Sequence, residues 1–419
     1  MKKLILKATV AGMALMSVPT LVLVTPAAAD ECLIDTDENL LAEEVGTTDG
    51  ANSPDNLACG RSANATGDRS TVIGTNADAS AAAAGGVAIG HDADVSAVGA
   101  VAIGGDQDND GFGAQATNDY AISIGAESAA SGRWSVAVGG FSVASDQWAV
   151  AVGHAAGATA NSAVAVGNNA RADFIDSVAL GGSADVGGVG AIAVGADANA
   201  NTANSIAIGA QSDATGSNSV AIGGDGADGD TLGAQATNDN TTAVGNDAVA
   251  SGSNSTAVGQ QAMATGISSN ALGRNAVASG DYTVSIGLGS SATLDRSVAL
   301  GVGSDVTGSN ATGLGWNADV LAAGGIAIGS SADVTAAATN GIAIGRLSDA
   351  AAIGAIAIGG DGTDLGSNGA QATGDYAMAI GVDAVANNAS TTAVGREAAA
   401  TGLQSFAMGY RSTSSGQNS

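Results

Sequence analysis

A short apolar segment that ends in glycine recurs through most of this chain, and its spacing constrains the fold more than any other feature. Its clearest copy is Asn218-Ser219-Val220-Ala221-Ile222-Gly223. Self-similarity at a fixed short period is typical of repeat architectures, in which each unit packs on its neighbours. The closing glycine occurs 23 times with a dominant spacing of fourteen, at positions 74, 90, 104, 125, 139, 153, 167, 181, 195, 209, 223, 245, 259, 273, 287, 301, 315, 329, 345, 359, 381, 395 and 409.

Each unit reads as two short strands. The residues one and three positions before the glycine are large, and the residue between them is Ala, Ser or Gly in 22 of the 23 copies. Alternation with a period of two is the strand pattern. After the glycine the pattern becomes x-x-A-x-A-x-G, which predicts a second strand with one small face and one polar face. Two strands and two glycine turns in so short a unit predict an all-β fold, in which each unit is one flat coil of a parallel β-solenoid.

The small residues must face the inside of so flat a coil, because only Ala, Ser and Gly fit between its strands. The large residues of the first strand then face outward, and 23 coils at about 4.8 Å per coil form a rod of roughly 110 Å. Burying one such side chain stabilises by about 1.5–3 kcal/mol, so we expect the stripe to be covered by further copies of the chain. The predicted interface residues include Val136, Val138, Ile206, Ile208, Val220, Ile222, Ile356 and Ile358.

A helical interpretation needs a test because the repeat is as long as two heptads. Apolar pairs two residues apart do not form the a/d seam of a coiled coil. The 64 glycines would each destabilise a helix by about 1 kcal/mol. The pattern therefore favours the solenoid.

The N-terminal part of the chain differs from the repeats. Residues 1–29 combine lysines, an apolar run and a small-residue exit, which predicts a secretory signal peptide. Residues 30–61 are interpreted as a cap or lead-in, in which Cys32 and Cys59 are expected to pair in the oxidising compartment that export implies. The predicted β-solenoid occupies residues 62–419.

The charge balance excludes some partners. All three lysines lie in the predicted leader, so nine arginines face 40 acidic residues and the exported chain carries a net charge of about −31. Such a surface repels nucleic acid and acidic membranes. No nucleic-acid partner is therefore predicted, and no later stretch approaches the roughly 18 apolar residues of a membrane span.

The unit N-S-V-A-I-G-x-x-A-x-A-x-G resembles the head repeat of the YadA-like trimeric autotransporter adhesins. It is intact from Asn218 to Gly223 and nearly so from Asn204 to Gly209, and the resemblance covers roughly residues 62 to 419. The resemblance implies a left-handed parallel β-roll and a homotrimer. It also implies display on the outer membrane of a Gram-negative bacterium, where the head binds host matrix or cell-surface molecules.

Collagen-binding members of the family use surfaces of this kind, so the resemblance implies Asn204, Ser205, Asn218 and Ser219 as ligand-binding residues. The family also carries a coiled-coil stalk and a membrane anchor. Because Ser419 falls in the middle of a repeat, we expect the chain to be a partial reading frame, with membrane attachment only through an anchor absent from it. A secreted or surface structural fibre without a receptor is the alternative function.

Three acidic inserts interrupt the period, at about residues 105–119, 224–239 and 360–375. In the first, Asp106, Asp108 and Asp110 match the first half of a calcium loop, D-x-D-x-D-G, but Thr117 stands where that loop needs a bidentate acid. The other two inserts echo the calcium-binding motif GGxGxD. Calcium is therefore a candidate ligand, with ordinary solvated acidic turns as the alternative. No other cofactor is predicted.

Catalytic chemistry finds little support in the sequence. The two histidines, His91 and His154, each follow a closing glycine and have no nucleophile motif beside them. We therefore predict no catalytic residues and no enzyme. Four aromatic residues beside strands or turns are interpreted as contact residues or as covers for turns and chain seams, namely Trp134, Phe141, Trp148 and Trp316.

Overall fold

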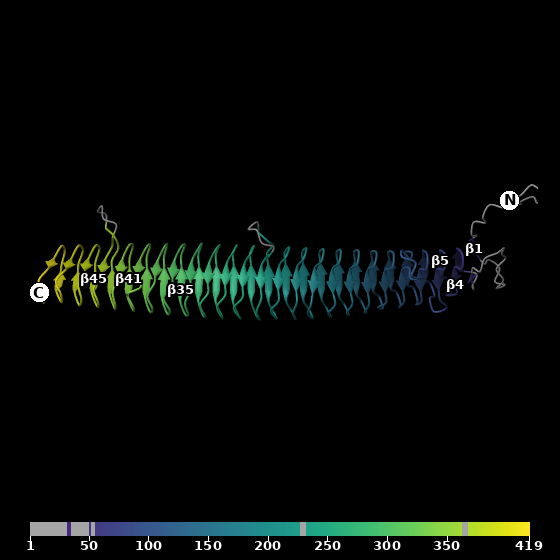
Figure 1. The fold of residues 1–419 in the computed structure, drawn as a ribbon, viewed down its shortest axis with the longest axis horizontal. Helices are drawn as coiled ribbons and strands as arrows, with labels where there is room; N and C mark the ends of the chain where they lie inside the picture. Colours follow the sequence, from purple (N-terminus) through teal and green to yellow (C-terminus); the bar gives the residue numbers. More distant parts are fainter. Residues whose placement is uncertain (1–31, 35–49, 52–54, 227–231, 363–367) are drawn as a thin grey trace, which may run out of the picture.

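The chain forms one long stack of flat coils, with the first coil and the last coil at opposite ends (Figure 1). The computed structural model describes residues 32–34, 50–51, 55–226, 232–362 and 368–419. These residues form strands joined by turns and bends, with no helix among them. The predicted all-β parallel solenoid is thus confirmed, while the predicted signal peptide lies outside the described residues.

Every coil contributes one strand of three residues and one of two. From β3 (Leu57–Cys59) to β49 (Phe406–Met408), each odd-numbered strand comprises the three residues directly before a closing glycine. From β4 (Asn64–Ala65) to β50 (Thr413–Ser414), each even-numbered strand begins four residues after that glycine. The exceptions follow the inserts and are β10 (Gln115–Ala116), β26 (Gln235–Ala236) and β44 (Gln371–Ala372).

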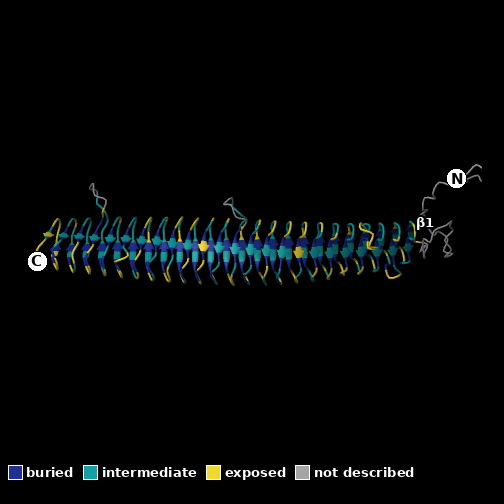
Figure 2. Ribbon diagram, viewed as in Figure 1, coloured by how far each residue is buried: buried dark blue, intermediate teal, exposed yellow. Residues whose placement is uncertain are grey.

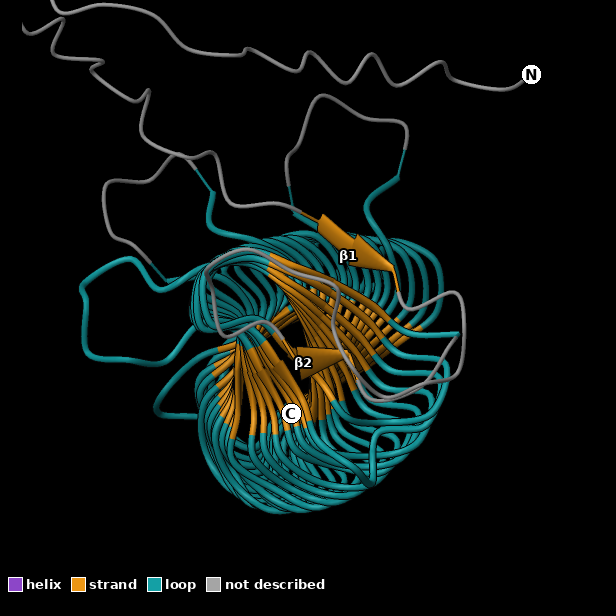
Figure 3. Cartoon of the chain, turned by 90° about the vertical axis from the view of Figure 1, so that its right-hand side faces the viewer, coloured by secondary structure: helices purple, strands orange, loops and turns teal. Residues whose placement is uncertain are grey.

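The odd-numbered and the even-numbered strands form two separate sheets that face each other across the coil (Figure 3). Within each sheet, neighbouring coils pair in parallel and in register. Across the second insert, β25 (Val220–Ile222) pairs with β27 (Thr242–Val244), and Val220 lies opposite Thr242. The inserts therefore project from the rod without shifting the stack.

Alanine fills the space between the two sheets, as the repeat predicted. The middle residue of β25, Ala221, has no exposed surface, and the equivalent Ala207 of β23 (Ile206–Ile208) is also fully buried. Buried residues alternate with more exposed ones along each short strand, so the core is a thin layer at the centre of the rod (Figure 2). A thin alanine layer is what so few large side chains can build.

Some coils hold a larger inward residue than the sequence argument allowed. Val95, Val306 and Val320 lie inside the coil with no exposed surface. Opposite them the chain has glycine: a Cβ on Gly313 would come within 2.7 Å of Val306 Cγ2, and one on Gly325 within 2.6 Å of Val320 Cγ1. The expectation that only Ala, Ser and Gly fit was therefore wrong, because the missing side chain at a facing glycine, in a strand or just before one, makes room for valine.

The two glycines of a unit are required for different reasons. Gly223 has a φ of +146°, and a Cβ there would lie 2.3 Å from the carbonyl oxygen of Gly245 in the next coil. Gly252 has ordinary backbone angles, but its Cβ would lie 1.9 Å from the carbonyl oxygen of Gly266. Close stacking therefore excludes a side chain at Gly223 and leaves no room for one at Gly252, whereas other coils hold Phe174 or Leu294 in the turn position of Gly252.

The solenoid begins earlier than the sequence boundary of residue 62. β3 pairs in parallel with β5 (Thr71–Ile73), so Leu57–Cys59 already forms the first strand of the stack, and Gly60 has the positive φ of a closing glycine. β1 (Cys32–Ile34) pairs antiparallel with β3 and places Cys32 opposite Cys59. Cys59 is disulfide-bonded, and this register supports the expected pairing with Cys32.

Candidate interaction surfaces

The outward residues of the odd-numbered strands form a mainly apolar surface along the rod, here called the Val/Ile stripe. In each of the strands with predicted interface residues, the central residue is buried and the flanking pair is partly exposed. Ile208 and Ile222 keep 38% and 37% of their surface exposed in the single chain. The outward orientation predicted for Val136, Val138, Ile206, Val220, Ile356 and Ile358 is also observed.

Polar side chains interrupt this stripe in its central part. Thr242, Thr256 and Asn270 occupy the first outward position of β27, β29 (Thr256–Val258) and β31 (Asn270–Leu272), in register with Val220 and Val284 on either side. The sequence analysis did not single them out. The signal was available, because each stands three residues before a closing glycine.

The proposed ligand residues of the N-S-V-A-I-G segments divide into two groups. Asn204 and Asn218 lie exposed at a turn with positive φ, and the Asn204 amide Nδ2 donates to Asn218 Oδ1 at 3.2 Å. Ser205 and Ser219 are fully buried, and Ser205 Oγ donates to the Thr202 carbonyl at 2.7 Å. The prediction that these serines contact a ligand is therefore wrong. They face the core because they precede the strand by one residue.

The first insert folds around Asp106. Its Oδ1 accepts hydrogen bonds from the backbone N–H groups of Asp108 and Asn109, and its Oδ2 accepts one from Gly111. Desolvation by itself would raise the pKa of Asp106, but these backbone donors outweigh it and the pKa lies below the usual value. Asp106 is thus held ionised at the centre of the loop.

An acid from the next coil completes the cluster that the sequence left open. The carboxylate oxygens of Asp106, Asp108 and Glu127 all lie within 4.8 Å of one another. Asp110 belongs to neither acidic cluster found in the described residues, and its Oδ1 accepts the Phe112 amide at 3.0 Å. Glu127 was missed because it lies beyond the end of the insert in the sequence, at a turn that only coil stacking brings near Asp106.

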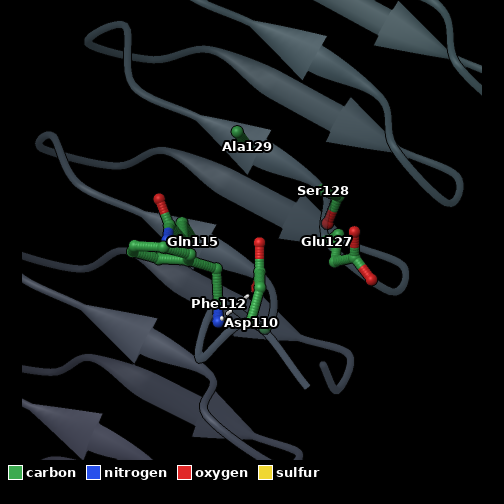
Figure 4. Close-up of a pocket in the computed structure, with 7 residues that line it drawn as sticks. Asp110, Phe112, Gln115, Glu127, Ser128 and Ala129 are labelled. Carbon is green, nitrogen blue, oxygen red and sulfur yellow. Dashed lines mark hydrogen bonds between the residues drawn. The ribbon is translucent and has the colours of Figure 1, made fainter. Parts of the chain in front are cut away.

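A second cluster lies on the other side of Asp106, in the preceding coil. His91, Asp92 and Asp106 each offer a ligand atom within 4.8 Å of the others, and His91 Nδ1 lies 3.0 Å from Asp92 Oδ2. A pocket beside the insert is lined by Asp110, Phe112, Gly113, Gln115, Glu127, Ser128 and Ala129 (Figure 4). The carboxylate oxygens of the first cluster, Asp106, Asp108 and Glu127, are the kind of ligand that hard cations such as Ca²⁺ prefer.

The three inserts share one contact. In each, a backbone N–H three residues after the closing glycine donates to an acid of the following coil. The pairs are Gln107 with Glu127 at 3.0 Å, Gly226 with Asp247 at 2.8 Å and Gly362 with Asp383 at 3.0 Å. The recurrence shows that each insert is tied to the coil above it.

Aspartates form a ladder on the outward face of the even-numbered strands. Asp305, Asp319, Asp333 and Asp349 lie directly opposite one another on β36 (Asp305–Val306), β38 (Asp319–Val320), β40 (Asp333–Val334) and β42 (Asp349–Ala350). Desolvation raises the pKa of Asp319, Asp333 and Asp349, and neighbouring carboxylates raise it further at Asp319 and Asp333. This face is polar but electrostatically strained.

A thin solenoid with repeated glycine turns and an outward apolar stripe defines a class of extended, repeat-built proteins. The profile of the YadA head domain repeat matches more than half of the chain, and the chain therefore belongs to the YadA head family. The matched residues are 57–77, 111–128, 130–156, 149–170, 158–184, 187–212, 203–225, 236–262, 264–290, 278–304, 372–398 and 400–419.

The family consists of adhesin-type proteins of the cell surface, whose members generally form trimers and bind host molecules. It is a non-enzymatic family. No curated protein matches the chain. In the described residues, no helix is long and apolar enough to cross a membrane.

Proposed function

We propose that this chain is the head of a homotrimeric adhesin, which is displayed on the outer membrane of a Gram-negative bacterium and binds host matrix or cell-surface molecules without catalysis. The observation that carries the proposal is the Val/Ile stripe. It runs the length of the stack, with its partly exposed side chains in register from coil to coil. An apolar surface of this extent needs a partner, and a symmetric assembly of identical chains supplies one.

The proposed adhesive role is supported by the surfaces that stay exposed to solvent after assembly. If the stripes meet at the symmetry axis, the polar face, the turns and the acidic inserts of every chain remain in solvent. Three chains then present each feature three times on a stiff support. Many weak contacts held together in this way bind a polymeric ligand far more tightly than one contact does.

Asn204 and Asn218 are the ligand residues that remain after the structure buries the two serines. Their side chains are exposed and joined in a short amide ladder along one edge of the rod. An amide ladder offers both donors and acceptors to a peptide backbone. We propose a collagen-like ligand for this surface.

The assembly is tested on the purified full-length mature chain. We expect a mass three times that of the monomer in sedimentation or light-scattering experiments. A monomer in dilute buffer would contradict the trimer.

Ligand binding is tested on immobilised collagen with the variant Asn204→Gly/Asn218→Gly. Glycine keeps the positive φ of both turns and removes only the amides. We expect binding to fall about tenfold, since lost contacts act in several chains at once. Asn310→Gly/Asn340→Gly, in the same turn position elsewhere, is the matched control. Equal binding by both variants would reject the ligand assignment, and a trimer that binds no matrix component would favour a structural fibre.

A second proposal concerns calcium at the first insert, favoured by the convergence of Asp106, Asp108 and Glu127. Titration calorimetry with Ca²⁺ on the full chain measures it. We expect Asp108→Asn/Glu127→Gln to remove the heat of binding and Asp110→Asn to retain it. If the unmodified chain gives no heat of binding, the calcium proposal is rejected. The insert is then an acidic turn held by its own hydrogen bonds.

A further inference from the structure

The N-terminal half of the Val/Ile stripe does not by itself fix the axial register of an assembly. From β7 (Val87–Ile89) to β25, ten successive strands carry only Val, Ile or Leu in both outward positions. The rows repeat once per coil, and the first insert does not break them. A partner chain displaced by one coil would meet nearly identical rows. This part of the stripe therefore holds chains together without fixing their height.

One group of side chains on these coils does not repeat. Tyr120, Trp134 and Trp148 occupy the same turn of three successive coils and form what is here called the aromatic ladder. The rings of Tyr120 and Trp134 stack with centroids 6.5 Å apart and planes 9° apart, and those of Trp134 and Trp148 lie 5.8 Å apart at 6°. Their exposed fractions are 50%, 37% and 50%. Two of the three tryptophans of the chain lie here.

The turn itself does not call for aromatic residues. All three have a positive φ, between 56° and 59°, which bulky side chains adopt only at a cost. The same turn position holds asparagine at Asn204 and Asn218, the residue type that best tolerates this conformation after glycine. Folding of the coil alone therefore does not explain why three aromatic residues occupy this turn.

The opposite edge of the same coils carries a second aromatic group. Phe141 and His154 follow the closing glycines 139 and 153, and their rings meet edge to face with centroids 5.6 Å apart. Phe141 is 39% exposed and His154 is also exposed. This aromatic pair lies at the height of Trp134 and Trp148, because β13 (Val136–Val138) and β15 (Val150–Val152) belong to the coils of both groups.

Rotation about an axis parallel to the rod brings the two groups together. The stripe is bounded by the two turn edges, so in a parallel cyclic assembly one edge of each chain faces the other edge of its neighbour at equal height. We propose that the aromatic ladder of one chain packs against the aromatic pair of the next and so fixes the axial register of the assembly. The proposal rests on the cyclic assembly proposed above.

The charged groups at the ladder are compatible with a covered edge. The Arg133 guanidinium lies over the Trp134 ring, with Cζ 3.9 Å from its centroid, and its Nε is 3.7 Å from Asp119 Oδ2. The arginine is thus already compensated by a carboxylate and a ring. Covering this edge with a second copy leaves Arg133 paired.

Register is read by disulfide cross-linking between full-length chains with different tags. One chain carries Val220→Cys and the other Ile192→Cys, two coils apart on the stripe. Two coils span about 9.6 Å, beyond the reach of a disulfide, so this mixed product forms only between displaced chains. We expect no mixed product with the native ladder. With Tyr120→Asn/Trp134→Asn/Trp148→Asn we expect it at a yield within about twofold of the like-position product.

Two further variants complete the experiment. Phe141→Asn/His154→Asn removes the aromatic pair on the opposite edge, so the mixed disulfide product must form with this variant as well. Tyr282→Asn/Tyr376→Asn changes exposed tyrosines in the ladder's turn position on other coils and must not.

An intact trimer that keeps its register in the triple variant overturns the proposal. Dissociation of that variant into monomers also overturns it, because the stripe alone is expected to hold the chains together. Failure of the underlying assembly looks different: the unmodified chain is then monomeric and gives no cross-linked product of any kind.

Discussion

The two strands of each coil share a backbone geometry but present opposite surfaces. The odd-numbered strands show Val and Ile in register, as at Val220 and Ile222. The even-numbered strands mix polar groups with apolar residues such as Val249 and Val277, and between Asp305 and Asp349 they stack four carboxylates in direct opposition. Stacking in register places equivalent side chains of successive coils directly opposite one another. It therefore adds apolar contacts along the stripe and like-charge repulsion along the aspartate ladder.

The two faces therefore differ in whether covering them stabilises the fold. The stripe gains stability only when it is covered, whereas the aspartate ladder would lose stability if it were covered, because desolvation already raises the pKa of three of its members. The solenoid thus has one face that is stabilised by being covered and one that is not.

Charge placed on the stripe should have the largest effect. Val220→Asp/Ile222→Asp would bring carboxylates to the axis of the proposed trimer, where an unpaired buried charge costs several kcal/mol. We expect the trimer to dissociate at micromolar concentration, as measured by sedimentation. The matched control, Val249→Asp/Val277→Asp, puts the same charges on the outward face of β28 (Val249–Ala250) and β32 (Val277–Ala278) and should leave the mass unchanged. An intact trimer with charged stripes would disprove the assignment of the two faces.

A milder substitution should stabilise the assembly by making the stripe more uniformly apolar. Asn270→Val replaces an asparagine on this apolar surface, so we expect the apparent melting temperature of the trimer to rise by about 2–5 °C. Asn199→Val on the polar face is the control. Asn199 Nδ2 donates to Asp213 Oδ1 at 3.2 Å, so its loss should give no gain. A fall in melting temperature for Asn270→Val would show that a specific amide contact stabilises the axis.

Neutralising the aspartate ladder should also raise the melting temperature, but by less. In Asp319→Asn/Asp333→Asn the repulsion between neighbouring coils disappears, and we expect the melting temperature at pH 7 to rise by about 1–3 °C. Asp213→Asn is the control, because its neighbours in the sheet, Asn199 and Gln235, are uncharged. An equal rise in the control would mean that desolvation alone sets the strain.

The smallest effect is expected from pH. A carboxyl group whose pKa is raised in the folded state binds its proton more tightly when folded, so stability increases as pH falls through that raised pKa. The gain is complete below the ordinary value of 3.8. Asp106 and Glu397, whose pKa values are lowered, oppose it at the acidic end. The melting temperature of the native chain should therefore rise by about 1–2 °C between pH 7 and pH 4. It should rise by less for Asp319→Asn/Asp333→Asn, which loses two of the raised carboxyl groups but keeps those of Asp349 and Asp213. A fall for the native chain would contradict this balance.

Most of the fold could be predicted from the repeat, because a two-residue alternation and a glycine at each turn leave few choices for so short a unit. The inward Ala221 and outward Ile222 follow directly from that pattern. The start of the stack at Leu57 was missed because Leu57-Ala58-Cys59-Gly60 carries a cysteine where the other copies carry an apolar residue. Its closing glycine lies one full repeat before Gly74 and was the available signal.

The interaction surfaces were less accessible to sequence reasoning. Ser205 and Ser219 were assigned to ligand binding through the resemblance to collagen-binding repeats, yet both are fully buried in this chain. Glu127 joins the acidic cluster only because the coil after the insert stacks directly above it. Such neighbours depend on the length of the insert and not on distance along the chain.

The sequence by itself determined the coil, the direction in which its alanines point and the existence of an apolar stripe, since these follow from the strand alternation and the length of the repeat. The tertiary structure alone decided which residues of different coils meet: Glu127 with the first insert, glycine with the inward valines, and Tyr120 with Trp134 and Trp148. The physical reason is that the repeat fixes each residue's position within its own coil, whereas contacts along the rod depend on which side chains, repeated or not, the stack brings to the same edge.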